Sequence, residues 1–142
     1  MIRVLLVDDH CMVRAAVERL LREVPEIEVV GSAGGGAEAL FLVRRVRPDV
    51  VLMDLSMPEV DGIAAARAIL AAFPEVRVLA FSAYYEPEPV VDAFEAGVTG
   101  YLLKGGDVDE LVEALRAAAL GKRWLSAAVA LAIRAIRPDE ET

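Results

Sequence analysis

The stretch from Val50 to Pro58 constrains the fold of this chain more than any other. It opens with four apolar residues, reaches Asp54, and then passes through Pro58 to the Asp61–Gly62 pair. An apolar run of this length between turn signals is typical of a strand buried on both faces. We therefore expect Asp54 at the carboxyl end of a central strand, which is where ligands bind in open α/β sheets. An aspartate there is a candidate nucleophile or metal ligand, although a turn or capping aspartate fits this single motif equally well.

Four further segments predict strands, at 2–7, 27–30, 76–81 and 101–103. The segment 27–30 alternates between apolar and polar residues, as a half-exposed edge strand does. Apolar residues at helical spacing lie between the strands, and prolines or glycines end these helical stretches. About five strand–helix units therefore alternate, which predicts an α/β protein with a parallel sheet covered by helices on both faces. Right-handed crossovers and the size of the chain favour the flavodoxin-like, doubly wound, five-stranded order 2-1-3-4-5.

The composition of the chain limits its classes of partner. The chain has 142 residues, enough for one domain, and a formal net charge of −8. An acidic segment does not favour a phosphate backbone, so we expect no nucleic-acid binding by this segment itself. Its single cysteine, Cys11, allows no internal disulfide, and we expect it to be a small buried residue. Because no targeting signal or membrane-spanning segment is visible, we expect a cytoplasmic protein with no membrane partner.

The residues at the strand ends form a common set. The predicted strands end at Asp8 and Asp9, at Asp54, at Ser82 and at Lys104. In a parallel sheet all carboxyl ends lie on one edge, so these side chains should meet around the crevice between the first and third strands. A plainer interpretation makes them a helix cap, a turn hydroxyl and a surface amine. Their convergence from four different strands favours a single site.

The charges of this set predict its chemistry. Three neighbouring carboxylates repel one another unless a cation joins them, and Mg²⁺ suits a small carboxylate site that also receives a phosphate. Three aspartates, one Mg²⁺ and Lys104 sum to zero charge, so the site would accept an incoming phosphoryl group. Lys104 and Ser82 would contact the phosphate oxygens. An aspartate that attacks phosphorus forms an acyl phosphate.

Several short motifs together resemble a receiver domain of two-component response regulators over residues 1 to 121. They are Leu6-Val7-Asp8-Asp9-His10, Asp54-Leu55-Ser56-Met57-Pro58 with Asp61-Gly62, Phe81-Ser82-Ala83, and Tyr101-Leu102-Leu103-Lys104. The resemblance implies that Asp54 accepts the phosphoryl group, as a 4-aspartylphosphate, from a phosphohistidine of a sensor histidine kinase. It also implies that Asp8, Asp9, Asp54 and the backbone carbonyl of Ser56 hold Mg²⁺.

The resemblance also implies a switch. Ser82 and Lys104 would bind the phosphoryl group, and Tyr101 would be the aromatic residue that moves inward when Asp54 is phosphorylated. Such a protein is a signalling switch and not an enzyme, because it catalyses only its own phosphotransfer and dephosphorylation. This chain has Gly105 after Lys104, where many receivers have a proline.

Asp8-Asp9-His10 and the segment from Gly121 to Ser126 are similar to the LuxR-type (NarL/FixJ) branch of these regulators. That branch appends a helix-turn-helix DNA-binding domain and regulates transcription. We expect residues 1–121 to be the receiver domain without that domain, and residues 122–142 to be an extra C-terminal helix with Ser126 as N-cap and the start of a linker. This tail helix, or the helix after Asp107, would support a homodimer.

Other interpretations remain open at this stage. One is a stand-alone or unphosphorylated receiver-like interaction module, and another is a Mg²⁺-dependent phosphohydrolase acting on a free metabolite. A flavin-binding protein shares the expected fold, but Asp8 and Asp9 would repel its phosphate. His10, the only histidine, is more simply a helix-start residue than a phosphate donor.

Overall fold

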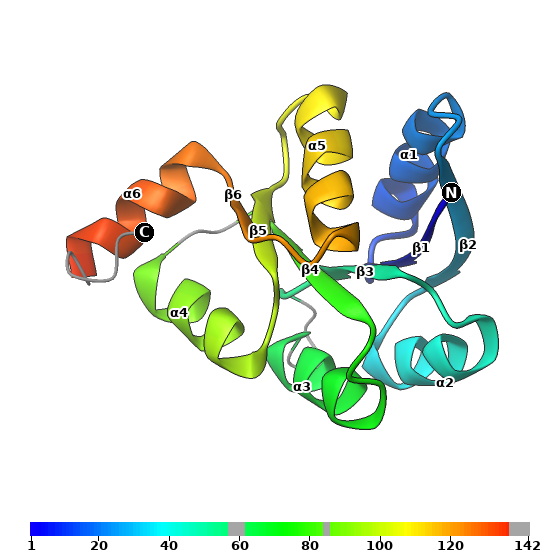
Figure 1. Cartoon of the computed structure of the whole chain (residues 1–142), viewed down its shortest axis with the longest axis horizontal. Coiled ribbons are helices and arrows are strands. Elements are labelled where there is room, and N and C mark those ends of the chain that lie inside the picture. Colours follow the sequence, from blue (N-terminus) through cyan, green and yellow to red (C-terminus); the bar gives the residue numbers. More distant parts are fainter. Residues whose placement is uncertain (57–61, 84–85, 137–142) are drawn as a thin grey trace.

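Six strands and six helices alternate along the described part of the chain (Figure 1). This computed structural model describes residues 1–56, 62–83 and 86–136. The strands are β1 (Ile2–Val7), β2 (Ile27–Ala33), β3 (Val50–Asp54), β4 (Arg77–Ser82), β5 (Gly100–Leu103) and β6 (Trp124–Leu125). The helices are α1 (Cys11–Arg22), α2 (Gly36–Val46), α3 (Gly62–Ala72), α4 (Pro87–Ala96), α5 (Val108–Ala119) and α6 (Ala127–Ile136).

The strands form one parallel sheet in the order β2-β1-β3-β4-β5-β6. This confirms the predicted flavodoxin-like order and places the first and third strands side by side at the centre. The prediction of five strands was one short, because β6 adds a parallel partner to β5. β6 has only two residues, Trp124 and Leu125, which are too few to show the alternation of apolar and polar residues that predicts a strand.

Side chains that alternate along each strand fill two separate cores. In β1, Val4 and Leu6 pack with the residues of α1 and α5, whereas Leu5 and Val7 pack with those of α2, α3 and α4. Figure 1 shows α1 and α5 above the sheet, α2, α3 and α4 below it, and α6 at the side, near β6. All five residues of β3 are buried, as expected for a strand covered on both faces. This double cover places Asp54 at the end of the least accessible strand.

Local sequence signals set most element ends. Asp107 is the N-cap of α5, where its carboxylate accepts a hydrogen bond of 2.9 Å from Glu110 N. Pro87 begins α4, and Gly97 ends it with φ of 109°. Several boundaries differ from the predicted ones, by one residue at each end of β4 and at the start of β5. β2 continues to Ala33, three residues beyond the predicted end, because its ladder with β1 continues past a register shift. Gly36 is the first residue of α2.

Gly105 adopts a backbone conformation that explains its presence after Lys104. Its φ is 92°, in the region that L residues with a side chain rarely adopt. Proline, with φ held near −65°, does not fit this conformation.

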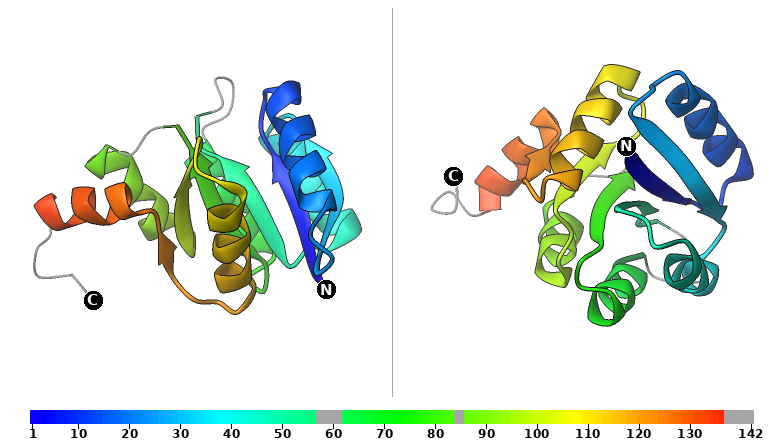
Figure 2. Two further views of the ribbon diagram at one scale, coloured as in Figure 1. Left: turned by 90° about the horizontal axis from the view of Figure 1, so that it is seen from above. Right: turned by 45° about the vertical axis from the view of Figure 1, so that its right-hand side comes forward.

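Residues 123–134 pack on the sheet and on α4. Ser126 N donates to Tyr101 O at 3.1 Å, and the Ser126 hydroxyl accepts a hydrogen bond of 3.1 Å from Leu103 N. Val129 of α6 is fully buried in the same core as Tyr101. Figure 2 shows α6 beside α4, and the two helices are in contact. The tail is thus attached to β5 and α4, while the predicted domain boundary at residue 121 stays a prediction.

Some expectations concern residues outside the described ranges. These are the turn at Met57, Pro58 and Asp61, the pocket-rim residues Tyr84 and Tyr85, and the linker start at 138–142. Among the described residues, none of the helices has the length and apolarity that crossing a membrane requires.

The buried position of Val129 predicts a stability effect. Val129→Ala removes two methyl groups from a closed core, so we expect the free energy of unfolding to fall by about 1.5–3 kcal/mol. The matched control is Leu131→Ala on the same helix, because Leu131 is 64% exposed and its removal should change stability by less than about 0.5 kcal/mol. Urea unfolding followed by circular dichroism measures both. Equal losses in the two variants would show that α6 does not pack on the domain.

Candidate functional site

The predicted site residues lie together at the carboxyl edge of the sheet. The register pairs Val7 with Met53, Asp54 with Phe81, and Ser82 with Leu103. The residues that follow β1 and β5, and the last residues of β3 and β4, therefore reach one level. This arrangement follows from the parallel order alone, because all strands run in the same direction.

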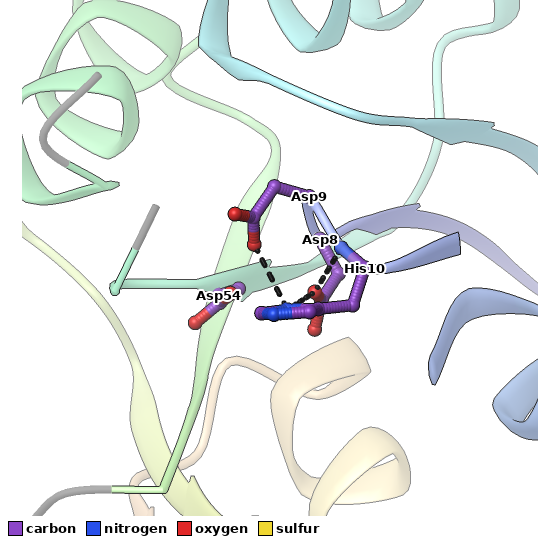
Figure 3. Close-up of side chains that lie close together, drawn as sticks. All are labelled: Asp8, Asp9, His10 and Asp54. Carbon is purple, nitrogen blue, oxygen red and sulfur yellow. Dashed lines mark hydrogen bonds and ion pairs between the residues drawn. The ribbon is translucent and has the colours of Figure 1, made fainter. Parts of the chain in front are cut away.

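Three carboxylates and one imidazole converge at this edge (Figure 3). Ligand atoms of Asp8, Asp9, His10 and Asp54 all lie within 4.8 Å of one another. Asp8 and Asp54 are buried, with 3% and 1% of their surfaces exposed. His10 Nδ1 lies 3.2 Å from Asp8 Oδ1 and 3.1 Å from Asp9 Oδ1. The sequence analysis assigned His10 to the helix start, and its backbone is indeed the N-cap of α1.

Lys104 supplies the positive charge of the cluster. Its Nζ lies 2.7 Å from Asp8 Oδ2 and 3.5 Å from Asp54 Oδ2. The ammonium also lies 5.4 Å from the centre of the Phe81 ring, in cation–π range. Lys104 therefore makes a charged hydrogen bond to Asp8 and a weaker, longer ion pair with Asp54.

The two buried aspartates have opposite pKa shifts. Burial acts to raise the pKa of Asp8, but hydrogen bonds from Lys104 and His10 outweigh it, so this pKa is lowered. Burial raises the pKa of Asp54 and prevails over the hydrogen bond from Ser56 N and the charge of Lys104, while the charge of Asp8 adds to the increase. The fold thus favours an ionised Asp8 and opposes the charge on Asp54.

Two carboxylate oxygens of the cluster are available to bind a cation. Asp9 Oδ1 and Asp54 Oδ2 are buried and accept no hydrogen bond from the described residues, although His10 and Lys104 lie near them. A buried carboxylate oxygen without a donor is costly, and a hard divalent ion would satisfy both oxygens. The donor set therefore fits the Mg²⁺ expected from the sequence.

The hydroxyl residues lie beside Asp54. Ser56 N donates to Asp54 Oδ1 at 2.9 Å, and the Ser56 hydroxyl lies 3.4 Å from that of Ser82. Ser82 is 1% exposed. Tyr101 is also buried, at 1% exposure, and burial raises the pKa of its phenol against the lowering effect of its hydrogen bond with Ser82. The structure therefore shows Tyr101 in the inward position. That the Ser56 carbonyl binds a metal stays a prediction.

Two positioning residues escaped the sequence analysis. Arg14 of α1 donates to the carbonyl oxygen of Asp8 and, at 3.1 Å, to the hydroxyl of Ser32 in β2, so it fixes the turn that carries the acidic pair. Gly62, at the start of α3, leaves no space for a Cβ, which would lie 2.5 Å from the carbonyl oxygen of Asp54. A charged residue in the first turns of the helix after an acidic pair was the available signal for Arg14.

One sequence expectation at the site was wrong. Cys11, the first residue of α1, is exposed instead of buried. The apolar positions of α1 that face the core begin after it, with Val13 and Val17. A position at the very start of a helix has little neighbouring chain to cover it, and residue type alone does not reveal this.

The site and fold match a known family. The model of the response regulator receiver domain matches residues 4–116. Response regulator GacA of Pseudomonas viridiflava is 39% identical over 141 residues, which cover 98% of this chain and 66% of that protein. Response regulator UvrY of Escherichia coli K12 is 38% identical over 142 residues, covering 99% of this chain and 65% of that protein. The chain therefore belongs to the response regulator receiver domain family.

Solved structures agree with this assignment. A two-component response regulator of the LuxR family from Aurantimonas sp. SI85-9A1 has a TM-score of 0.92 at 38% identity, covering 98% of this chain and 99% of that one. The signal receiver domain of NarL from Mycobacterium tuberculosis has a TM-score of 0.80 at 39% identity, covering 85% of this chain and 98% of that one. The LuxR-type branch expected from the sequence is confirmed. The chain spans about two thirds of the length of the curated relatives it matches.

The opposite pKa shifts predict opposite effects of two isosteric substitutions. Without divalent cations at pH 7, Asp54→Asn should raise the free energy of unfolding by about 1 kcal/mol, because it removes a charge that the fold opposes. Asp8→Asn should lower it by about 1–3 kcal/mol, because it removes the charge that Lys104 stabilises.

The contributions of Asp54 and Asp8 to stability also depend on pH in opposite ways. The raised pKa of Asp54 means that its contribution is favourable at low pH and is lost as the pH rises through the folded-state pKa. The lowered pKa of Asp8 means that its contribution is present above the ordinary aspartate pKa and is lost as the pH falls. In urea titrations, the Asp54→Asn difference should therefore shrink as the pH falls from 7 to about 4, whereas the Asp8→Asn difference should persist to about pH 4 and shrink only below it. Destabilisation by Asp54→Asn at pH 7 would contradict the burial argument.

Proposed function

We propose that this chain is the phospho-accepting receiver of a two-component response regulator, with Asp54 as the phosphorylated residue. The observation that carries the proposal is the Asp54 carboxylate itself. It is buried at the shared edge of the sheet, its Oδ2 accepts no hydrogen bond from the described residues, and Lys104 lies 3.5 Å away. The protein would act as a signalling switch whose only catalysis is its own phosphotransfer and dephosphorylation.

The reaction is transfer of a phosphoryl group from a phosphohistidine of a sensor kinase. Asp54 Oδ2 forms the new P–O bond, the P–N bond of the donor breaks, and the departing imidazole nitrogen takes up a proton. Asp54 Oδ1 stays on the backbone N–H of Ser56, which orients the carboxylate. Positioning and charge neutralisation provide most of the catalysis in such transfers.

Mg²⁺ would be held by Asp8, Asp9, Asp54 and the backbone carbonyl of Ser56. When bound, it neutralises carboxylate charge and polarises phosphoryl oxygens. Lys104 would stay beside Asp54 and contact a phosphoryl oxygen, and Ser82, whose hydroxyl lies next to that of Ser56, would donate a hydrogen bond. These contacts supply the positive charge that the acidic cluster otherwise lacks.

An apolar groove borders this site and suits the approach of the kinase. The groove has a volume of about 270 Å³ and lies between α1 and the loop that joins β5 to α5, with Lys104 in its wall. Leu20 lines it and is half-exposed, and Met12 on the same helix is largely exposed. A kinase helix seated there would lie beside Lys104, which is itself 3.5 Å from Asp54.

The switch would link Asp54 to the surface of α4 and β5. A phosphoryl group on Asp54 would attract the Ser82 hydroxyl. The sequence analysis expected Tyr101 to move inward at this step, but Tyr101 is already buried, so phosphorylation would hold it in the inward position. A nearly complete switch needs about 5.5 kcal/mol of differential stabilisation, to which a new dianion with Lys104, Ser82 and Mg²⁺ contacts would contribute.

We propose that the whole regulator is a cytoplasmic protein that regulates transcription. DNA recognition would come from a helix-turn-helix domain of the kind found in LuxR-type regulators and not from this acidic segment. Dimerisation would use the exposed side of α5 or α6, where Leu120 and Leu131 are largely exposed.

Chemical phosphorylation tests the role of Asp54. Acetyl phosphate with Mg²⁺ should add one phosphoryl group to the parent protein, and Asp54→Asn should abolish the addition because the nucleophile is gone. Asp92→Asn, on the exposed side of α4, is the matched control and should label like the parent. Intact-protein mass spectrometry measures the product. Labelling of Asp54→Asn at the parental level would remove Asp54 from its role, and turnover of free phosphate esters would favour a phosphohydrolase.

The coupling to assembly is tested by sedimentation. Labelling the parent protein should shift the monomer–dimer equilibrium toward the dimer. Lys104→Ala should still accept some label, but the shift should be lost because the lysine no longer ties the phosphoryl group to β5. Sedimentation velocity with and without acetyl phosphate measures both. A monomer under every condition, or a complete shift without Lys104, would contradict this part of the proposal.

A further inference from the structure

The imidazole of His10 does not cap the helix that it begins and contacts Asp8 instead, with Nδ1 3.2 Å from Oδ1. His10 is the N-cap of α1, a position whose side chain normally accepts a hydrogen bond from the first turn, yet its side chain makes no such bond. The ring lies instead over the carboxylates of Asp8 and Asp9, as Figure 3 shows. The side chain is 67% exposed, so packing does not hold it there.

The separations in the cluster match those of neighbouring ligands on one ion. His10 Nδ1 lies 3.2 Å from Asp8 Oδ1 and 3.1 Å from Asp9 Oδ1. Adjacent ligands of an octahedral cation with bonds of about 2.1 Å lie about 3.0 Å apart. The Asp54 oxygen lies within the same 4.8 Å set. Asp9 Oδ1 and the buried Asp54 Oδ2 accept no hydrogen bond from the described residues, so a cation would satisfy these two oxygens as well.

We propose that His10 Nδ1 is a direct ligand of the cation at this site and that it shifts the preference of the site from Mg²⁺ toward a first-row transition dication such as Mn²⁺. The inference rests on the proposed function, because it concerns the same carboxylates. Mg²⁺ prefers oxygen ligands alone, whereas imidazole nitrogen binds transition metals more strongly. Binding requires the neutral ring with its proton on Nε2. One nitrogen among carboxylate oxygens therefore selects between the two cations.

A competing explanation makes the opposite prediction. If the ring served as a protonated counter-ion to Asp8 and Asp9, any bound cation would have to displace it. Removing the ring would then tighten the binding of both Mg²⁺ and Mn²⁺. If the ring is a ligand, its removal weakens Mn²⁺ and leaves Mg²⁺ nearly unchanged. The sign of the change separates the two roles.

Pulsed EPR of Mn²⁺ bound to the whole chain provides a direct test. His10 is the only histidine among the 142 residues, so labelling with ¹⁵N-histidine marks this ring alone without any mutation. We expect ¹⁴N modulation of the Mn²⁺ echo in the unlabelled protein and its replacement by ¹⁵N coupling in the labelled protein. Identical spectra from the two samples would overturn the assignment.

Binding constants provide the second test. His10→Ala should weaken Mn²⁺ binding by about tenfold or more and change Mg²⁺ binding by less than about threefold. Cys11→Ala is the matched control, because Cys11 is the adjacent exposed residue and its thiol is the other soft ligand near the site. It should keep both affinities and the nitrogen coupling. Tighter binding of both ions to His10→Ala would assign the counter-ion role instead.

The tests distinguish failure of the proposed role of His10 from failure of the proposed function. Mg²⁺-dependent labelling of Asp54 by acetyl phosphate combined with no histidine coupling would overturn only the role of His10. Absence of any divalent-ion binding, together with absence of labelling, would overturn the proposed function as well.

Discussion

The site depends on one lysine shared unequally between two buried carboxylates. Lys104 lies 2.7 Å from Asp8 Oδ2 and 3.5 Å from Asp54 Oδ2. A single positive charge cannot compensate three aspartates, so the nearer carboxylate is stabilised and Asp54 is left with its charge opposed by burial. The fold thereby opposes the negative charge of the Asp54 carboxylate, and a cation bound beside it would stabilise that charge. A more evenly placed lysine would stabilise Asp54 and make it less responsive.

Parallel topology makes this arrangement possible. Asp8 and Lys104 are 96 positions apart in the sequence, yet both directly follow strands that end on the same edge. The burial of Asp54 at 1% exposure follows from its place at the end of β3, which has strands on both sides and helices on both faces. Burial of the Asp54 carboxylate costs free energy, and burial of apolar side chains, including those of Val50 to Met53, offsets this cost.

The sequence predicted the parts of the fold that repeat and the parts of the site that carry charge. Strand order and the meeting of Asp8, Asp54 and Lys104 follow from apolar runs that stop at polar residues, a signal that a single sequence contains. β6 escaped prediction because two residues carry no period, and pairing with β5 gives them their structure.

Contacts that depend on where side chains lie in three dimensions could not be predicted from a single sequence. Nothing in the composition of α1 shows that Cys11 is exposed or that Arg14 reaches back to the carbonyl of Asp8. The inward orientation of the His10 ring has the same origin, because a ring at a helix start is free to turn either way until the neighbouring carboxylates are placed.

β5 joins the site to the C-terminal segment within four residues. Lys104 N donates to Ser82 O at 2.8 Å, which binds the end of β5 to β4 next to Asp54. One residue earlier, Leu103 N donates to the hydroxyl of Ser126, and Ser126 N donates to Tyr101 O. The residues from Tyr101 to Lys104 therefore include the lysine beside Asp54, the buried tyrosine and the hydrogen-bond partners of Ser126. A displacement of β5 that follows Lys104 cannot leave Ser126 in place without breaking one of these hydrogen bonds, which gives the tail a physical connection to the charge state of Asp54.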